Sequence, residues 1–131
     1  MQGFCGTDII EVERIKEAIL NTEGFKEKVY TQKEIEVGDK KSETIRYQYY
    51  AGRFAAKEAV YKALSREYGD KIVFLDVEIL NDKNCKERPI VNILNKEVLQ
   101  DVEIGKLYID VSISHLKEYA TANAYITIKM D

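Results

Sequence analysis

The stretch AGRFAAKEAVYKAL, residues 51–64, decides how this chain folds. It is rich in alanine, contains no proline and has its one glycine near the start, so its intrinsic preference is helical. On a helix of ordinary geometry, Glu58 and Lys62 lie one turn apart on one side, whereas Arg53 and Lys57 share the opposite side. The helix therefore lacks the single polar face of an ordinary surface helix. We therefore expect the Glu58 carboxylate and the Lys62 ammonium to contact a group other than water.

A simpler interpretation of Glu58 and Lys62 stays open at this point. A glutamate followed four residues later by a lysine forms a favourable ion pair, which stabilises an exposed helix by about 0.3–0.5 kcal/mol. Such pairs are common, so the spacing alone favours an ion pair over a binding or catalytic pair. Other parts of the chain have to decide between the two.

The composition indicates one globular domain of modest size. The chain has 131 residues, of which 45% are hydrophobic and 33% are charged, and its net charge is −3. These values fit a single domain over residues 1–131 with one core. The slightly acidic balance argues against a general nucleic-acid binder, whose basic surface would dominate the charge.

Neither a membrane anchor nor a zinc site is expected. No apolar run reaches the ~18 residues of a transmembrane helix, and residues 1–7 lack the basic start of a signal peptide. The single histidine and the two cysteines, Cys5 and Cys85, do not have the spacing of a zinc site. We expect a cytoplasmic protein with reduced thiols, in which Cys5 is a small buried side chain.

Asp8 is expected where a short opening strand gives way to a helix. Residues 1–6 suit the strand, and Asp8 followed by Glu11 is typical of a helix start, which predicts a helix over residues 9–20. Asp8 then has two open interpretations. It caps this helix by accepting backbone N–H bonds, worth ~1 kcal/mol, or it acts together with a second carboxylate.

Two further helices are predicted in the first half of the chain. Thr31 and Glu34 have the spacing of a capping box, which predicts a short helix over residues 32–38. Ser42 is placed to cap a long helix that continues into residues 51–64. The tyrosines of this helix are expected to pack with their hydroxyl groups in water.

After Leu64 the hydrophobic period changes from that of a helix to that of a strand. Alternating apolar and polar residues predict strands over residues 71–80, 90–94, 107–115 and 119–130, the last two forming an antiparallel hairpin. A short helix over residues 95–104 is closed by Gly105. The fold class is therefore α+β, with helices packed on one mainly antiparallel sheet.

Asp8, Glu58, Lys62 and His115 are the side chains with the clearest chemical potential. Two carboxylates and one ammonium suit a hard cation such as Mg²⁺ that is shared with a phosphate. Mg²⁺ keeps several waters and takes only one or two protein carboxylates when a substrate phosphate completes its coordination shell. The spacing does not show that residues 8 and 58 meet in space.

Four phrases of the sequence together resemble one enzyme family. They are GTDIIEVERI (6–15), YTQKE (30–34), AGRFAAKEAVYKAL (51–64) and VSISH (111–115) with Tyr119 and Ala120. In order and spacing they closely resemble the holo-[acyl-carrier-protein] synthases over essentially the whole chain. The resemblance implies the 4′-phosphopantetheinyl transferase fold. It also implies transfer of the phosphopantetheine arm of coenzyme A to a serine of apo acyl carrier protein, which releases adenosine 3′,5′-bisphosphate and supports fatty acid biosynthesis.

The resemblance further implies a homotrimer with active sites between protomers and a role for each matching residue. Asp8 matches the aspartate of the family's GTD motif and Glu58 the glutamate of FAAKEA, both Mg²⁺ ligands. Lys62 is expected near the transferring phosphate. His115 ends the SISH motif and is expected to line the coenzyme A site, as a phosphate contact or as a proton acceptor. Glu58, Lys62 and His115 thus form the implied catalytic set, and Lys62 and His115 also bind coenzyme A.

Partner and nucleotide contacts follow from the same resemblance. Arg14 and Lys16 match positions that face the acidic carrier protein, although solvated helix charges remain the simpler alternative. Asn84 and Pro89 are expected to help hold the nucleotide end of coenzyme A. Asn84, Lys86 and Arg88 are the candidate contacts of their turn, residues 84–89, which is longer than the family's and lacks its glycine.

Several alternatives remain open on the sequence alone. Arg53 and Lys57 are assigned to structural pairing or to a neighbouring subunit. The proton of the acceptor serine is taken by Glu58 or by a water ordered on the metal. A coenzyme A-binding module without catalysis, and a structural interaction domain whose carboxylates only cap and pair, are the competing functions.

Overall fold

The computed structural model describes residues 1–85 and 87–130. The elements follow in the order β1 (Gln2–Glu11), α1 (Val12–Asn21), α2 (Phe25–Val29), α3 (Gln32–Asp39), α4 (Glu43–Tyr68), β2 (Val77–Asp82), β3 (Arg88–Ile93), α5 (Lys96–Glu103), β4 (Leu107–His115) and β5 (Tyr119–Ile128). Two short 3-10 turns, Gly69–Lys71 and Phe74–Asp76, connect α4 to β2.

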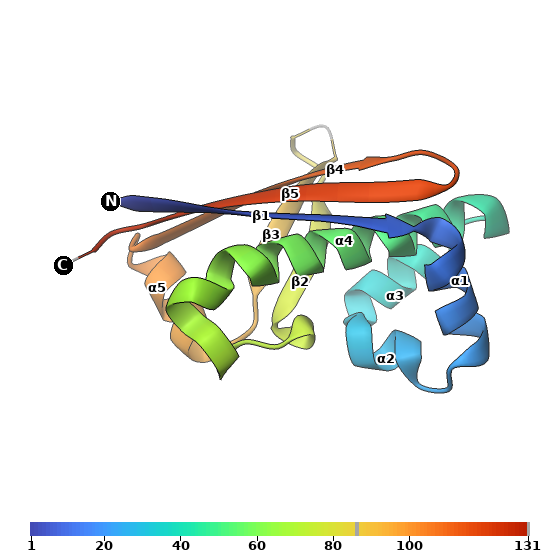
Figure 1. Ribbon diagram of the computed structural model, residues 1–131, viewed down its shortest axis with the longest axis horizontal. Helices are drawn as coiled ribbons and strands as arrows, with labels where there is room; N and C mark the ends of the chain where they lie inside the picture. Colours follow the sequence, from blue (N-terminus) through green and yellow to red (C-terminus); the bar gives the residue numbers. More distant parts are fainter. Residues whose placement is uncertain (86, 131) are drawn as a thin grey trace.

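The long helix α4 lies in the middle of the molecule. A three-stranded antiparallel sheet, in the order β1-β5-β4, runs along one side of it (Figure 1). The helices α1, α2 and α3 gather at one end, and α5 lies at the other end, with the two-stranded β2–β3 sheet between them. Because neighbours cover α4 on most sides, it has no single polar face, as its sequence pattern indicates.

Small side chains let the sheet approach α4 closely. From the helix, Ala55, Ala56, Ala59 and Ala63 are buried, and from β5 every second residue is buried against it. The buried β5 positions are Ala120, Ala122, Ala124, Ile126 and Ile128. This alternation is that of a strand with one face on the core, and it confirms the strand predicted there.

The prediction of a helix starting after Asp8 is wrong. β1 continues to Glu11 and pairs with β5 along its whole length, with Asp8 opposite Ala122. The helix begins at Val12, whose N–H donates to the carbonyl of Glu118 at 2.8 Å. β-branched residues on both sides of Asp8 favour the strand, and long-range pairing satisfies more backbone groups than a local cap does. Asp8 is therefore a strand residue and not an N-cap.

Most of the other predicted elements are confirmed. The capping box forms, with the Thr31 hydroxyl accepting from the Glu34 N–H and the Glu34 carboxylate accepting from the Thr31 N–H. The α+β class and the antiparallel pairing are confirmed, but the prediction of one sheet is wrong, because the strands of the described residues form a three-stranded and a two-stranded sheet. α2 was not predicted. In the described ranges, no helix has both the length and the apolar character needed to cross a membrane.

Three local expectations fail for identifiable reasons. β2 begins at Val77, because the Asp76 carboxylate accepts from the Val73 N–H at 3.0 Å and holds the preceding residues in a turn. Cys5 is exposed, since strand alternation points Gly6 toward α4 and Cys5 away from it. The hydroxyl groups of Tyr49 and Tyr50 bind protein acceptors, which include the backbone carbonyls of α3.

Candidate functional site

Gly6 sets the contact between β1 and α4. A Cβ atom at this position would lie 1.9 Å from the carbonyl oxygen of Ala59 and 2.9 Å from the backbone nitrogen of Ala63. Only glycine allows the strand backbone to approach the helix this closely. The approach brings Asp8, two residues further along β1, next to the α4 residues Glu58 and Lys62.

Lys62 reaches from the helix to the strand. Its Nζ donates to the carbonyl of Thr7 at 3.0 Å and lies 3.5 Å from Oδ1 of Asp8. Among the described residues the ion pair of Lys62 is with Asp8, so the simple helical pair with Glu58 is not the arrangement that forms. The Lys62 side chain is 49% exposed, which leaves its ammonium accessible to a ligand.

Asp8 and Glu58 form a site with an excess of negative charge. Burial raises the pKa of the Glu58 carboxyl, the Asp8 charge raises it further, and Lys62 opposes both effects. Oδ2 of Asp8 is buried and lacks a hydrogen-bond partner in the part of the chain that the structure describes. An unsatisfied buried oxygen costs about 1–3 kcal/mol, and a cation bound between the carboxylates would remove that cost.

The donor set fits a hard cation that takes few protein ligands. Two carboxylates are available, and residues 1–85 and 87–130 hold no cluster of three or more His, Cys, Asp or Glu side chains arranged for a metal. This excludes a closed protein cage of the zinc type within those residues. A cation whose remaining ligands are waters and substrate oxygens is compatible with it.

A cavity of about 240 Å³ lies beside Glu58. Tyr61, Ile72, Val73 and Phe74 supply its apolar lining. The Phe74 ring contacts the ring of Phe54, with centroids 5.4 Å apart, and that of Tyr61 at 6.4 Å. The cavity wall formed by residues 72–74 was not predicted from the sequence, because these residues follow the helix as a short apolar run that carries no functional motif.

His115 is not brought to the other candidate residues within one chain. It lies exposed at the end of β4, opposite Ala120, whereas Asp8 is on the other edge strand, opposite Ala122. Asp8 and His115 are separated by two strand-to-strand spacings across the sheet and by two residues along it. With ordinary strand geometry, their Cα atoms therefore lie roughly 12 Å apart. The structure therefore joins Asp8, Glu58 and Lys62 and leaves His115 apart from them.

The residues expected to contact the nucleotide end of coenzyme A lie in the β2–β3 hairpin. Asn84 is exposed, and its N–H donates to Oδ1 of Asp82 at 2.9 Å, while Pro89 pairs with Asn81 at the start of β3. Lys86, named with them, lies outside the described residues. The hairpin places Asn84 and Pro89 near each other, and their binding role stays a prediction.

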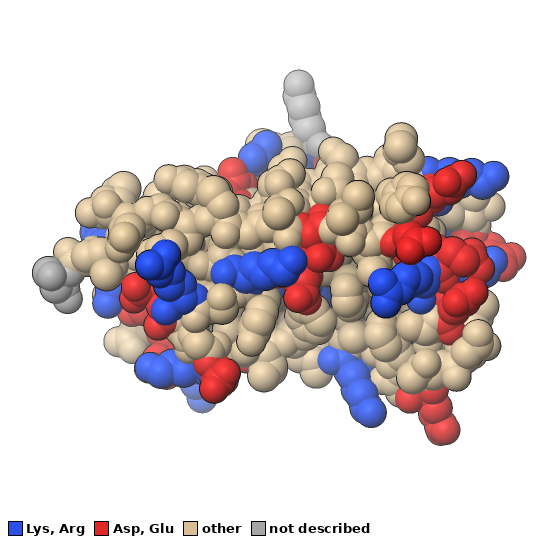
Figure 2. Space-filling view, viewed as in Figure 1, with Lys and Arg blue, Asp and Glu red and all other residues tan. Residues whose placement is uncertain are grey.

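The residues expected to bind the acyl carrier protein lie on α1. Arg14 is exposed, and Nζ of Lys16 lies 3.9 Å from Oε1 of Glu43 and 5.5 Å from the centre of the Tyr47 ring. On the face shown in Figure 2, basic side chains lie among acidic ones, also at the end of the molecule that carries α1. Binding of an acidic partner through Arg14 and Lys16 stays a prediction.

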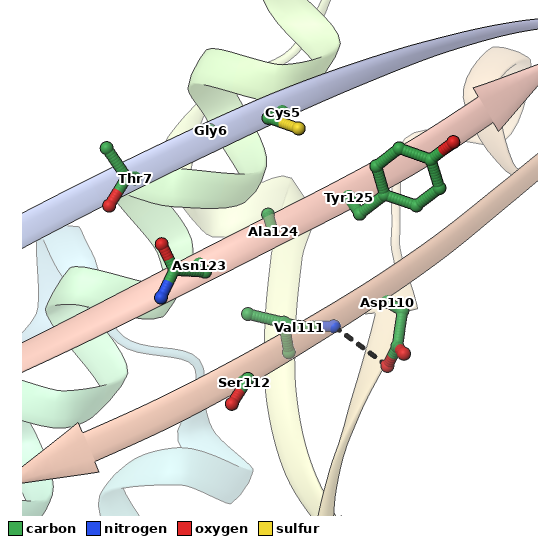
Figure 3. A pocket seen from close by; sticks show the side chains of 9 residues that line it. All are labelled: Cys5, Gly6, Thr7, Asp110, Val111, Ser112, Asn123, Ala124 and Tyr125. Atoms are coloured by element: carbon green, nitrogen blue, oxygen red, sulfur yellow. Dashed lines mark hydrogen bonds between the residues drawn. The ribbon is translucent and has the colours of Figure 1, made fainter.

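The outer face of the three-stranded sheet carries a second hollow, of about 370 Å³ (Figure 3). Cys5, Thr7, Ser112, Asn123 and Tyr125 are among its lining residues, contributed by all three strands. The ring of Tyr125 lies over the strands, and the residue is 48% exposed. Within one chain, none of the elements in residues 1–85 and 87–130 covers this sheet face.

Gly6→Ala is expected to lower stability and to displace Asp8 from Glu58. The added methyl group would meet the Ala59 carbonyl, so strand and helix must separate, and overpacking of this kind typically costs 1–3 kcal/mol. Urea denaturation and an activity assay measure the two effects. Cys5→Ala is the control, because it changes an exposed side chain at the neighbouring position of the same strand and should keep wild-type stability. Wild-type stability in Gly6→Ala would contradict this description of the contact.

Comparisons with known proteins agree on one protein family. Residues 4–124 match the family model of the 4′-phosphopantetheinyl transferase superfamily. The chain is 44% identical over 129 residues to a holo-[acyl-carrier-protein] synthase of Ruminiclostridium cellulolyticum, covering 98% of this chain and 94% of that protein. A second holo-[acyl-carrier-protein] synthase, from Fusobacterium nucleatum, is 44% identical over 124 residues, with 92% and 95% covered.

Solved structures agree with the sequence comparisons. The holo-(acyl-carrier-protein) synthase of Bacillus anthracis, solved in complex with CoA (3′,5′-ADP), superposes with a TM-score of 0.75 at 32% identity, covering 94% of each chain. An ACPS-CoA complex from Chronobacterium ammoniagenes gives a TM-score of 0.81 at 27% identity, covering 99% of this chain and 100% of that one. The chain belongs to the 4′-phosphopantetheinyl transferase superfamily.

Proposed function

We propose that this chain transfers the 4′-phosphopantetheine arm of coenzyme A to a serine of apo acyl carrier protein. The products are holo acyl carrier protein and adenosine 3′,5′-bisphosphate. The family match and the holo-[acyl-carrier-protein] synthase relatives support this reaction. The observation that carries it is the meeting of Asp8 with Glu58 and Lys62 where β1 crosses α4, because these groups suit a cation shared with a diphosphate.

Asp8 and Glu58 are the residues that would hold Mg²⁺. Oδ2 of Asp8 has no hydrogen-bond partner among the described residues, and burial together with the Asp8 charge raises the pKa of Glu58. One nearby positive charge, that of Lys62, faces two carboxylates, which leaves room for a cation. When bound, Mg²⁺ neutralises charge on the diphosphate and acts as a Lewis acid toward its oxygens. Lys62, half exposed beside Asp8, supplies a second positive charge toward the phosphoryl group that is transferred.

The reaction forms one bond and breaks one bond at phosphorus. The serine oxygen bonds to the phosphorus that carries the pantetheine arm, and the bond from this phosphorus to the bridging oxygen breaks. The electron pair stays on the bridging oxygen of the departing adenosine 3′,5′-bisphosphate. Glu58 accepts the serine proton as the general base.

The transfer is tested directly by mass spectrometry of the carrier protein. Incubation of this chain with coenzyme A, Mg²⁺ and the apo carrier protein from the same genome is expected to add the mass of one phosphopantetheine group. Replacing the acceptor serine by alanine in the carrier protein is the control and should prevent the addition. Binding of coenzyme A with no gain in mass would favour a binding module without catalysis over the transferase.

We propose also that the site is completed by a neighbouring copy in a homotrimer. Two observations support this: His115 lies roughly 12 Å from Asp8 in one chain, and the outer sheet face is uncovered and carries exposed Tyr108 and Tyr125. A heterologous interface that closes into a ring would bring β4 of one protomer toward α4 of the next. His115 then reaches the phosphates of coenzyme A bound to the neighbour.

Subunit mixing tests this arrangement. Asp8→Asn and His115→Ala trimers, each of low activity, are expected to regain activity when they are unfolded and refolded together. Random assembly would restore about a quarter of the sites, because a site needs Asp8 from one protomer and His115 from the next. Recovery to that level supports shared sites, whereas a mixture no more active than its parts contradicts them. Analytical ultracentrifugation reports the number of subunits.

Magnesium and coenzyme A together are expected to raise the melting temperature of the wild-type chain. Ligand that binds only the folded state at a hundred times its Kd adds about 2.7 kcal/mol to the free energy of unfolding. Asp8→Asn should lose most of the Mg²⁺-dependent part, since it removes one of two carboxylates. A melting temperature unmoved by Mg²⁺ in the wild type would favour a structural role for Asp8 and Glu58.

A further inference from the structure

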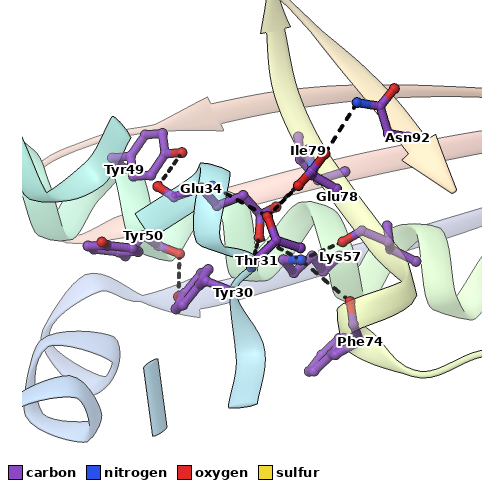
Figure 4. A network of polar contacts seen from close by, with 11 residues as sticks. Tyr30, Thr31, Glu34, Tyr49, Tyr50, Lys57, Phe74, Glu78, Ile79 and Asn92 are labelled. Atoms are coloured by element: carbon purple, nitrogen blue, oxygen red, sulfur yellow. Dashed lines mark hydrogen bonds and ion pairs between the residues drawn. The ribbon is translucent and has the colours of Figure 1, made fainter. Parts of the chain in front are cut away.

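We infer that Lys57 is a positioning residue, whose buried ammonium fixes the wall of the cavity that faces Glu58. The inference rests on the proposed function, because the effect of the wall is read in the transfer reaction. Lys57 precedes Glu58 on α4, so the two side chains leave the helix in different directions. Glu58 lines the cavity, whereas Lys57 enters the interior beneath α3 and the start of β2 (Figure 4).

The Lys57 ammonium is completely enclosed and has three protein partners. Its Nζ forms an ion pair with Oε1 of Glu34 at 2.8 Å, and both side chains are fully buried. The same nitrogen donates to the carbonyls of Phe74, at 3.4 Å, and of Val77. An ammonium has three hydrogens, and each hydrogen of Lys57 has one acceptor. We call Lys57 and its acceptors on Glu34, Phe74 and Val77 the junction.

Glu34 holds this junction in place from the other side. Its carboxylate also accepts from the backbone N–H of Thr31, at 2.8 Å, and of Ile79, at 2.7 Å. The pair thereby ties α4 to the first turn of α3 and to the first residues of β2. Figure 4 shows Lys57, Glu34 and the Phe74 carbonyl converging on this junction from three separate elements.

The segment that Lys57 anchors is the segment that forms the cavity wall. Val73 and Phe74 line the 240 Å³ cavity together with Glu58, and the carbonyl of Phe74 accepts a hydrogen bond from Lys57. Within the described ranges, the side-chain hydrogen bonds from α4 to residues 73–77 both come from Lys57. The Phe74 ring packs against Phe54 and Tyr61, and Asp76 closes the local turn, while Lys57 links the backbone of this segment to α4.

A buried ion pair is not needed for stability alone. Replacing such a pair by apolar residues of similar volume is often neutral or stabilising, because desolvation of the two charges offsets their attraction. Lys57 and Glu34 instead specify where one backbone segment lies relative to α4. Because that segment lines the cavity beside Glu58, we expect loss of the pair to weaken coenzyme A binding more than it slows the chemical step.

The test compares the double variant Glu34→Gln/Lys57→Met with Tyr50→Phe. The double variant removes both charges and leaves the Phe74 and Val77 carbonyls without their donor. Tyr50→Phe is the matched control, because it removes a hydroxyl on the same helix that donates to Asp39 at 2.7 Å, away from the cavity. For the double variant we expect the KM for coenzyme A to rise about tenfold with kcat within about threefold, whereas Tyr50→Phe keeps the wild-type KM.

Two further measurements separate positioning from general destabilisation. Hydrogen exchange at residues 73–79 should become faster in the double variant while the amides of β5 stay protected. Phe74→Ala, which shortens the wall and retains the ion pair, should raise the KM in the same direction. An unchanged KM in Phe74→Ala, or an unfolded double variant, overturns the inference. A wild-type chain with no transfer at all would overturn the proposed function itself, so the two failures are distinguishable.

Discussion

Glu58→Gln is expected to lower kcat for phosphopantetheine transfer by about 10²- to 10⁴-fold while the fold stays intact. The variant removes one of two carboxylates available to the metal and the base for the serine proton. Glutamine has nearly the same shape, and Glu58 is only partly buried, so packing around α4 should not change. Initial rates of carrier-protein modification, measured at saturating coenzyme A and Mg²⁺, give the effect.

A matched control separates this effect from a general change in helix charge. Glu67→Gln removes an exposed carboxylate from the last part of the same helix and should retain the wild-type rate. Circular dichroism and the melting temperature should be alike for both variants and the wild type. Near-normal modification by Glu58→Gln would remove the assignment of this residue to the reaction.

Lys57→Met alone is expected to lower the free energy of unfolding by about 3–5 kcal/mol, the largest effect of a single substitution on stability proposed for this chain. The change leaves the Glu34 carboxylate fully buried with no counter-charge. Burial lowers the pKa of Lys57 and the Glu34 charge opposes this shift, so each member of the pair depends on the other. Urea denaturation measures the loss.

The double variant Glu34→Gln/Lys57→Met should recover part of this stability, because it removes both buried charges together, although the Phe74 and Val77 carbonyls stay without their donor. The coupling energy between the two positions then follows from the double-mutant cycle. A Lys57→Met chain less than about 1 kcal/mol below the wild type would mean that the Glu34 carboxylate finds another partner or becomes protonated.

Features encoded by neighbouring residues could be predicted from the sequence. The capping box of Thr31 and Glu34, the long helix α4 and the β4–β5 hairpin each follow from spacing within a few residues. The family resemblance added the carboxylate pair, which the spacing alone did not connect. Gly6 carried a usable signal as well, because a glycine within a strand often marks a close approach of another backbone.

Features that depend on the pairing of distant elements could not be predicted in this way. Asp8 has local helix-start neighbours, yet pairing with a strand more than one hundred residues away decides its conformation. The ion-pair partner of Lys57 lies on α3, and its other two acceptors belong to the turn at Phe74 and to Val77, the first residue of β2. Helical spacing separated Lys57 from Glu58, but it did not show that both residues serve the same cavity.

The position of a bound cation shows whether Asp8 and Glu58 share one metal ion. Crystals grown with coenzyme A and Mn²⁺, a substitute for Mg²⁺ with an anomalous signal, would locate the ion without reference to activity. We predict one anomalous peak at about 2.0–2.3 Å from an oxygen of both Asp8 and Glu58, with its other ligands drawn from the diphosphate and water. A peak bound to neither carboxylate, or to only one of them with the diphosphate elsewhere, would contradict the shared site.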